Sequence, residues 1–194
     1  MRTGGNSVEA VQRVDLPLTP QKVRELQAGT PVRLFGEILT ARDAAHRRMV
    51  QALSRGEELP VLLKNTLIYY TGPCPARKGE VIGAAGPTTS SRMDTYTPRL
   101  LAEGLLGMMG KGDRSPAVIE AMKEYGAVYL AAPGGAGALL AGKITRAAAV
   151  AYEDLGPEAV FRLEVADFPA VVAIDIFGNN LYRRGRRKYA RSGG

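Results

Sequence analysis

The sequence has 194 residues, of which 45% are hydrophobic and 23% are charged, and it carries a formal charge of +7. This composition is typical of one globular α/β domain and excludes a disordered or fibrous chain. No apolar run approaches the roughly 18 residues that span a bilayer, and the N-terminus lacks the apolar centre of a secretory signal, so we expect a cytoplasmic protein. A single cysteine, Cys74, excludes an internal disulfide framework.

Most of the positive charge lies at the C-terminus. Residues 183–194 contain no acidic residue and six basic ones, which leaves +1 for the rest of the chain; the six are Arg183, Arg184, Arg186, Arg187, Lys188 and Arg191. A basic segment can bind nucleic acid by releasing counterions. Because this one contains a single aromatic residue and accompanies no recognisable nucleic-acid-binding module, we interpret it as a solvated or partner-contacting tail.

The N-terminal part of the chain predicts alternating helices and strands. Thr19 as N-cap and Pro20 at the first helical position predict a short helix that ends at Gly29. The alternating segment 31–40 is rich in branched and aromatic residues, which predicts a strand, and residues 41–56 predict the helix that follows it.

The alternation continues to about residue 150, after which the chain becomes rich in strand-forming residues. The expected elements are a strand over 65–72, a strand over 78–87 that enters a glycine loop, a helix over 97–107, a loop over 107–115, a helix over 116–125, a strand over 127–133, a short helix over 138–144 and strands between 150 and 180. This order predicts a largely parallel sheet with crossover helices and an additional antiparallel layer.

Three loops between these elements carry unusual side chains. Ligands of parallel sheets collect beyond the carboxyl ends of the strands, where we expect Arg42, the segment 86–94 and Lys111. Segment 86–94 places four hydroxyls beside Arg92, whose planar guanidinium suits a carboxylate. It is therefore a candidate anion site, with the structural alternative of a capping loop in which Arg92 pairs with Asp94.

The other candidates also have structural alternatives. Lys111 lies between two glycines, so its ammonium can reach into a cleft, but it could equally be a surface lysine. Arg42 could be only the partner of Asp43. His46 follows Arg42 by one helical turn and shares its face, and we assign it an orienting role rather than proton transfer. Neither glycine-rich segment has the spacing of a P-loop or of a dinucleotide-binding fingerprint.

Four segments taken together resemble one family. They are TARDAAH at 40–46, GPTTSSRMD at 86–94, GKGDRS at 110–115 and APGGAGALL at 132–140. They are similar to the β subunit, equivalently the C-terminal domain, of the iron–sulfur class I fumarases and L-tartrate dehydratases. The resemblance implies an α/β fold, a swivelling β/β/α three-layer domain with a parallel central sheet and a second antiparallel sheet. We place this domain at 15–182, between an N-terminal extension (1–14) and the basic tail (183–194).

The resemblance also implies a hydro-lyase that hydrates fumarate reversibly to L-malate with a [4Fe–4S] cluster. Such a cluster needs three protein thiolates, and this chain has one cysteine, so we expect a partner α subunit to hold it and this chain to bind no metal. The chain alone should be inactive. We expect a hetero-oligomer, with a homodimer as the alternative for the isolated chain, and neither a membrane nor a nucleic acid as partner.

The matched motifs imply a role for each site residue: Arg42, Arg92 and Lys111 bind the carboxylates of a C4 dicarboxylate, Thr88 and Thr89 are catalytic hydroxyls, and Asp43, His46 and Asp94 support them. A dianion closed off from water needs compensating cations, which arginine and lysine supply in complementary geometries. Thr88 is the candidate for proton transfer at carbon, with an acid from the α subunit completing the relay. The alternatives are an L-tartrate dehydratase β subunit and a non-catalytic domain that binds carboxylates or nucleic acid.

Overall fold

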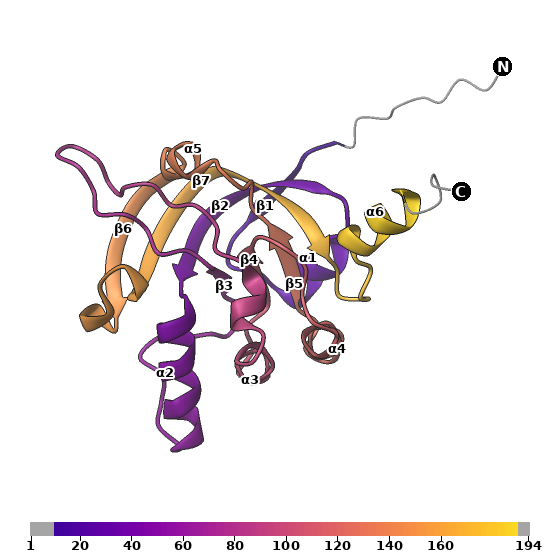
Figure 1. Ribbon diagram of the computed structural model, residues 1–194, viewed down its shortest axis with the longest axis horizontal. Helices are drawn as coiled ribbons and strands as arrows, with labels where there is room; N and C mark the ends of the chain where they lie inside the picture. Colours follow the sequence, from indigo (N-terminus) through magenta and orange to yellow (C-terminus); the bar gives the residue numbers. More distant parts are fainter. Residues whose placement is uncertain (1–9, 190–194) are drawn as a thin grey trace.

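A single mixed sheet dominates the computed structural model, which describes residues 10–189 (Figure 1). Its strands are β1 (Gln12–Asp15), β2 (Pro31–Thr40), β3 (Leu67–Tyr69), β4 (Gly107–Gly110), β5 (Val128–Ala131), β6 (Ile144–Ala151) and β7 (Val160–Ile174). The α-helices are α1 (Pro20–Glu25), α2 (Asp43–Ser54), α3 (Thr97–Ala102), α4 (Pro116–Tyr125), α5 (Gly137–Ala141) and α6 (Leu181–Tyr189), and 3-10 helices occur at η1 (Ser90–Met93) and η2 (Glu153–Glu158). The predicted α/β class is confirmed.

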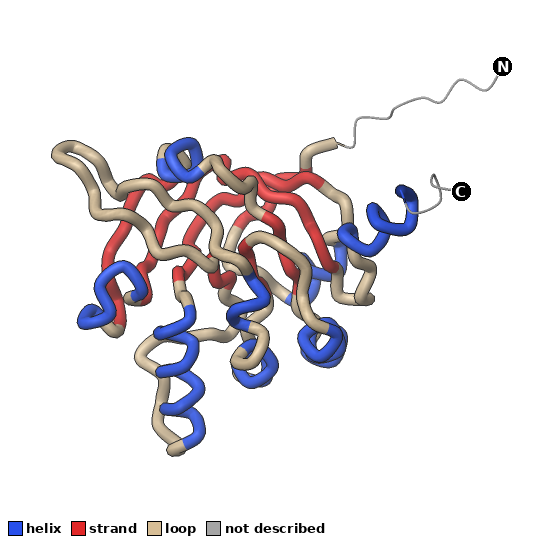
Figure 2. The backbone as a smooth tube through the Cα atoms, in the orientation of Figure 1, coloured by secondary structure: helices blue, strands red, loops and turns tan. Residues whose placement is uncertain are grey.

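The strand order is β1-β2-β3-β4-β5-β7-β6, and β2 pairs with β7 as well. Strands β1 to β5 pair with one another in parallel, whereas β7 is antiparallel to β2, β5 and β6. Because β7 bonds to both β2 and β5, the sheet curls and closes on itself (Figure 2). The predicted antiparallel strands are present, but they are hydrogen-bonded into the same sheet as the parallel ones instead of forming the separate second sheet that we expected.

Helices α2, α3 and α4 lie together on one side of the sheet, and α5 lies on the other (Figure 1). The short central strands are buried on both faces: Tyr69 belongs to one core cluster and its neighbour Tyr70 to the other, and Met109 and Met108 divide in the same way. Successive side chains of a strand point to opposite faces, so these strands are apolar at every position.

The helices that the capping signals predicted are confirmed. The Thr19 hydroxyl accepts a hydrogen bond from the Lys22 amide at 3.2 Å and begins α1. That helix ends at Glu25, with Leu26 as its C-cap, instead of at Gly29. Ser115 caps α4, and Gly126 ends it in the left-handed conformation at a φ of 69°.

Two predictions about the central segments are wrong. Residues 107–110, expected as a loop, form β4, and Gly107 lets the Leu18 and Leu67 side chains pack closely against it, since a Cβ there would lie 2.5 Å from the Leu18 Cδ1 atom. Residues 78–87, expected as a strand, belong to a long loop that bonds to itself through the Gly83 amide and the Cys74 carbonyl (3.1 Å). The loop also anchors to the core because the Tyr69 hydroxyl donates to the Ala85 carbonyl at 2.6 Å.

The predicted termini lie only partly within the described residues. Residues 1–9 of the expected extension and 190–194 of the expected tail lie outside them. Strand β1 begins at Gln12, inside the expected extension, and α6 crosses the expected boundary at residue 182. The domain limits stay a prediction. Within residues 10–189, no helix is long and apolar enough to span a bilayer.

Candidate functional site

The candidate loops meet at the end of the sheet where the parallel strands β2, β3 and β4 finish, which we call the carboxyl edge. Strands β2, β3 and β4 run parallel, so their carboxyl ends lie side by side. Backbone hydrogen bonds continue this alignment past the strand ends: the Ala41 amide donates to the Tyr69 carbonyl (3.2 Å), and the Thr88 amide donates to the Tyr70 carbonyl (2.7 Å). The three segments that the sequence singled out therefore adjoin one another.

Thr88 and Thr89 lie directly beside Lys111. Thr89 and Lys111 form a parallel β-bridge, and the Lys111 amide donates to the Thr88 carbonyl at 3.2 Å. This close approach depends on Gly110, because a Cβ at that position would collide with the Ser90 hydroxyl and lie 3.1 Å from the Thr88 carbonyl oxygen. Thr89 and Lys111 are exposed and Thr88 is half-buried, so these side chains are accessible to a ligand.

Arg42 and Arg92 converge on Asp43 at the start of α2. The Arg92 Nε atom donates to one oxygen of the Asp43 carboxylate at 2.8 Å, and the Arg42 Nε atom lies 3.7 Å from the other oxygen. The alternative in which Arg92 pairs with Asp94 is not what the structure shows. The Asp43 carboxylate instead lies between the guanidinium groups of Arg42 and Arg92.

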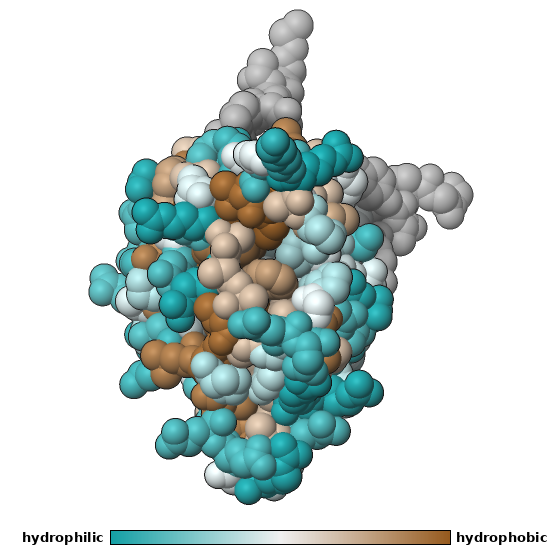
Figure 3. Space-filling view, turned by 90° about the vertical axis from the view of Figure 1, so that its left-hand side faces the viewer, coloured by the Kyte–Doolittle hydropathy of each residue, from teal (hydrophilic) through white to brown (hydrophobic). Residues whose placement is uncertain are grey.

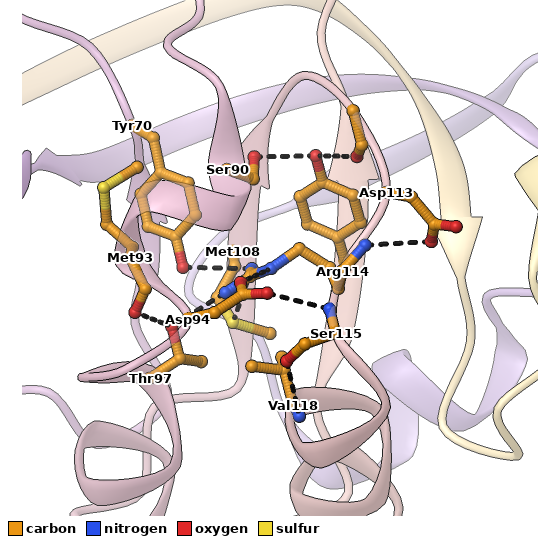
Figure 4. Close-up of polar contacts among 12 residues, drawn as sticks. Tyr70, Ser90, Met93, Asp94, Thr97, Met108, Asp113, Arg114, Ser115 and Val118 are labelled. Atoms are coloured by element: carbon orange, nitrogen blue, oxygen red, sulfur yellow. Dashed lines mark hydrogen bonds and ion pairs between the residues drawn. The ribbon is translucent and has the colours of Figure 1, made fainter.

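Asp94 binds a residue that the sequence analysis did not single out. Arg114 is 3% exposed, and its Nε atom donates to Asp94 at 2.7 Å (Figure 4). The other oxygen of Asp94 accepts from the Ser115 amide at 2.8 Å. The one feature of the sequence that could have pointed to Arg114 is its position in the GKGDRS segment, between Lys111 and the cap of α4.

The remaining guanidinium donors of Arg114 are also used. They reach the Thr97 hydroxyl at 2.7 Å and the Tyr70 hydroxyl at 3.2 Å, and the group packs against the Tyr70 and Tyr129 rings. Tyr129 in turn bonds to the Ser90 hydroxyl (2.7 Å) and to the Gly112 carbonyl (2.9 Å). This buried network fixes the loop of Lys111 against the loop of Thr88 and Thr89.

His46 lies beneath the site. It is fully buried, its Nδ1 atom is 2.9 Å from the Arg42 carbonyl oxygen, and its ring packs edge-on against Tyr70. Burial lowers the pKa of His46 from 6.5 to about 4, against the opposing effect of the Arg42 carbonyl. The ring is therefore neutral at pH 7, with a proton on Nδ1, and is suited to orienting Arg42 rather than to proton transfer.

A separate apolar groove of about 440 Å³ lies between the 71–87 loop, β6 and η2. Its lining includes Cys74, Val81 and Ala148, and Figure 3 shows apolar side chains gathered along this side of the molecule. It has none of the cationic residues of the candidate site. Within residues 10–189, no cluster of three or more His, Cys, Asp or Glu side chains could hold a metal ion.

The comparisons with known proteins agree on one family. The model of the family described as "Fumarase C-terminus" matches residues 2–185. The chain is 41% identical over 182 residues to "Fumarate hydratase class I, aerobic" of Salmonella typhimurium, an alignment that covers 91% of this chain and 31% of that protein. "Fumarate hydratase 2" of Leishmania major is 39% identical, with 89% of this chain and 31% of that protein covered.

A relative of matching length is a "Putative L(+)-tartrate dehydratase subunit beta" of Methanocaldococcus jannaschii. It is 39% identical over 177 residues, which cover 88% of this chain and 91% of that protein. By contrast, the chain spans about a third of the length of the fumarate hydratases described above.

Replacing Arg114 with Met should destabilise the protein by about 3–5 kcal/mol, because the substitution leaves the largely buried Asp94 carboxylate without its cation. Arg99→Met is the matched control: it breaks an ion pair with Glu103 that is exposed, and should cost less than about 1 kcal/mol. Urea unfolding followed by circular dichroism measures both. An Arg114→Met protein as stable as Arg99→Met would show that the buried pair does not hold these loops.

The single histidine makes a direct pH test possible. Unfolded His46 takes up a proton near pH 6.5 and folded His46 only near pH 4, so the unfolded state binds more protons between these values. The free energy of unfolding should therefore fall as the pH drops from 6.5 to 4, by up to about 3 kcal/mol from this group. The NMR shift of a carbon in the His46 ring should not titrate above pH 5.5. Replacing His46 with Gln should remove this part of the dependence of the unfolding free energy on pH. A ring that titrates near pH 6.5 would contradict the buried neutral state.

Proposed function

The chain belongs to the fumarase C-terminus family, and from this membership we propose that it is the β subunit of a hydro-lyase that hydrates fumarate reversibly to L-malate. In this proposal it supplies the residues that bind the substrate carboxylates. One observation carries the proposal: the three loops that carry Arg42, the threonines with Arg92, and Lys111 adjoin at the carboxyl ends of the parallel strands.

The charges of this edge suit a C4 dicarboxylate. Arg42 and Arg92 offer planar donor groups for one carboxylate, and Lys111 offers a compact ammonium for the other. Asp43 keeps the two arginines together while no substrate is bound, and a substrate carboxylate would compete with it for them. The buried Asp94–Arg114 pair and His46 support the loops from below.

Hydration places a hydroxyl on one carbon of the double bond and a proton on the other. Thr88 and Thr89 are positioned beside Lys111, and we assign Thr88 to the transfer of that proton. A threonine hydroxyl is a poor base unless a neighbour accepts its proton. We therefore expect an acidic residue of the partner to complete the relay.

The residues of this chain do not fit the iron–sulfur cluster that class I fumarases use. A cluster of this type needs three thiolates, whereas the chain has only Cys74, which is exposed in the 71–87 loop. We propose that an α subunit holds the cluster and that the two chains form a cytoplasmic hetero-oligomer, inactive as separate subunits. We further propose that the chain is a domain that swivels against this partner.

L-tartrate dehydration is the second candidate. The observation that favours it is the 39% identity with the protein of Methanocaldococcus jannaschii whose name is that of a putative tartrate dehydratase β subunit. Fumarate and tartrate chemistry use the same two carboxylates and differ in the hydroxyl groups between them. Turnover of fumarate, L-malate and both tartrates by the assembled enzyme would distinguish the candidates.

Replacing Lys111 with Ala should lower kcat/KM by about 10- to 100-fold, because the substitution removes a hydrogen bond to a charged carboxylate, worth about 1.5–3 kcal/mol. Arg92→Ala should have a similar effect. The measurement is hydration of fumarate after anaerobic mixing with a cluster-bearing α subunit, with each chain also assayed alone.

Lys123→Ala is the control, because Lys123 pairs with Glu120 on the exposed surface of α4, away from the candidate edge. It should retain full activity. Full activity in both Lys111→Ala and Arg92→Ala would overturn the site assignment. Activity of this chain without any partner would overturn the proposal that an α subunit supplies the cluster.

A further inference from the structure

Helix α2 begins with a residue that cannot cap it. The first amides of a helix need acceptors, which Ser, Thr, Asp or Asn normally provides from the N-cap position. Here the N-cap is Arg42, whose side chain has no acceptor and makes no capping hydrogen bond. The acceptor comes from far along the chain, because the Glu158 Oε2 atom accepts from the Ala44 amide at 2.9 Å.

The same carboxylate also contacts Arg42. The Glu158 Oε1 atom lies 3.4 Å from the Arg42 Nη2 atom, and both side chains are about three-quarters buried, with 23% and 27% of their surface exposed. Burial of this degree reduces screening by solvent, so the pair is stronger than an ion pair on the surface. Glu158 therefore substitutes for the missing cap and holds the side chain that occupies the cap position.

The surroundings confine the guanidinium further. A Cβ on Gly72 would lie 3.1 Å from the Arg42 Nη1 atom and 3.1 Å from the Pro157 carbonyl oxygen, so Arg42 passes close to both backbone segments. Gly156, at a φ of 56°, turns the chain at the end of η2 just before Pro157 and Glu158. Arg42 is thus enclosed by the 71–87 loop on one side and by η2 on the other.

Asp43 does not satisfy Arg42 on its own. The Arg42 Nε atom and the Asp43 Oδ2 atom are buried, lie 3.7 Å apart, and have no hydrogen-bond partner among the described residues. Asp43 instead accepts its short hydrogen bond, at 2.8 Å, from the Arg92 Nε atom. Arg42 therefore keeps a donor without an acceptor and depends on Glu158 for its orientation.

We propose that Glu158 is a positioning residue for substrate binding. It caps α2 in place of residue 42, which allows an arginine to occupy that position and face a substrate carboxylate. Glu158 itself touches no substrate. This inference rests on the proposed role of Arg42 in binding a dicarboxylate.

The test compares Glu158→Ala, Glu158→Gln, Arg42→Ala and Asp154→Ala in the assembled enzyme. Glu158→Ala should raise the KM for fumarate by about tenfold with a smaller change in kcat, because Arg42 loses its largely buried ion-pair partner. Glu158→Gln keeps an oxygen for the Ala44 amide, so it should unfold at the same temperature as the wild type and show an intermediate KM. Asp154 is the matched control, since it joins the same segment to Arg48 of the same helix without contacting Arg42, and its replacement should change the KM by less than about twofold.

A second readout needs no activity. Phenylglyoxal modifies accessible arginines, and peptide mass spectrometry of the full chain would give the rate at Arg42. Glu158→Ala should raise this rate severalfold and Asp154→Ala should not. If Arg42→Ala leaves the KM unchanged, the proposed function fails at this residue. If Arg42→Ala raises the KM while Glu158→Ala matches Asp154→Ala in both readouts, the positioning role of Glu158 is overturned.

Discussion

The buried ion pair between Arg114 and Asp94 is the interaction on which the candidate site depends. Arg114 follows β4 and Lys111, whereas Asp94 follows the Thr88–Arg92 segment, so the pair joins the two loops that carry most of the site. A charge removed from water is costly unless its donors and its charge are both satisfied. Asp94, Thr97, Tyr70 and the packed aromatic rings satisfy this one. These contacts hold the Lys111 loop and the Thr88–Arg92 segment in the arrangement that the structure shows.

At the same edge, buried side chains lie beneath the exposed residues of the candidate site. Tyr70, Tyr129 and His46 are buried below it, and Lys111, Thr89 and Arg92 are exposed above it. Backbone pairing between Thr89 and Lys111 sets their separation, and the missing side chain at Gly110 permits it. Lys111, Thr89 and Arg92 are therefore open to solvent above a buried interior that fixes their backbone.

Sequence patterns predicted the elements with strong local signals. The helix caps at Thr19 and Ser115 and the alternating residues of β2 are such cases. Strand β4 has the sequence Gly-Met-Met-Gly, which has little strand propensity, and its neighbours on both sides stabilise it instead. The apolar residues of 78–87 looked like a strand, yet Ile82 and Ala85 reach the core from a loop.

The sequence motifs named the residues of the candidate site, which stay a prediction, but they did not predict how those residues pair. Matched motifs singled out Arg42, Arg92 and Lys111, and the structure brings their loops to one edge. Nearness in sequence suggested Asp94 as the partner of Arg92, whereas the partner is Asp43, on another helix. Arg114 and Glu158 were missed because their importance comes from contacts with residues that are 20 and 114 positions away. Local patterns contain no information about such pairs.

The most direct measurement is a crystal structure of this chain assembled with the proposed cluster-bearing partner and L-malate. We expect one malate carboxylate to accept hydrogen bonds from Arg42 and Arg92, the other to accept one from Lys111, and Thr88 to lie beside the carbon that exchanges a proton. Malate held entirely by residues of the partner, with these three cations turned away from it, would contradict the account.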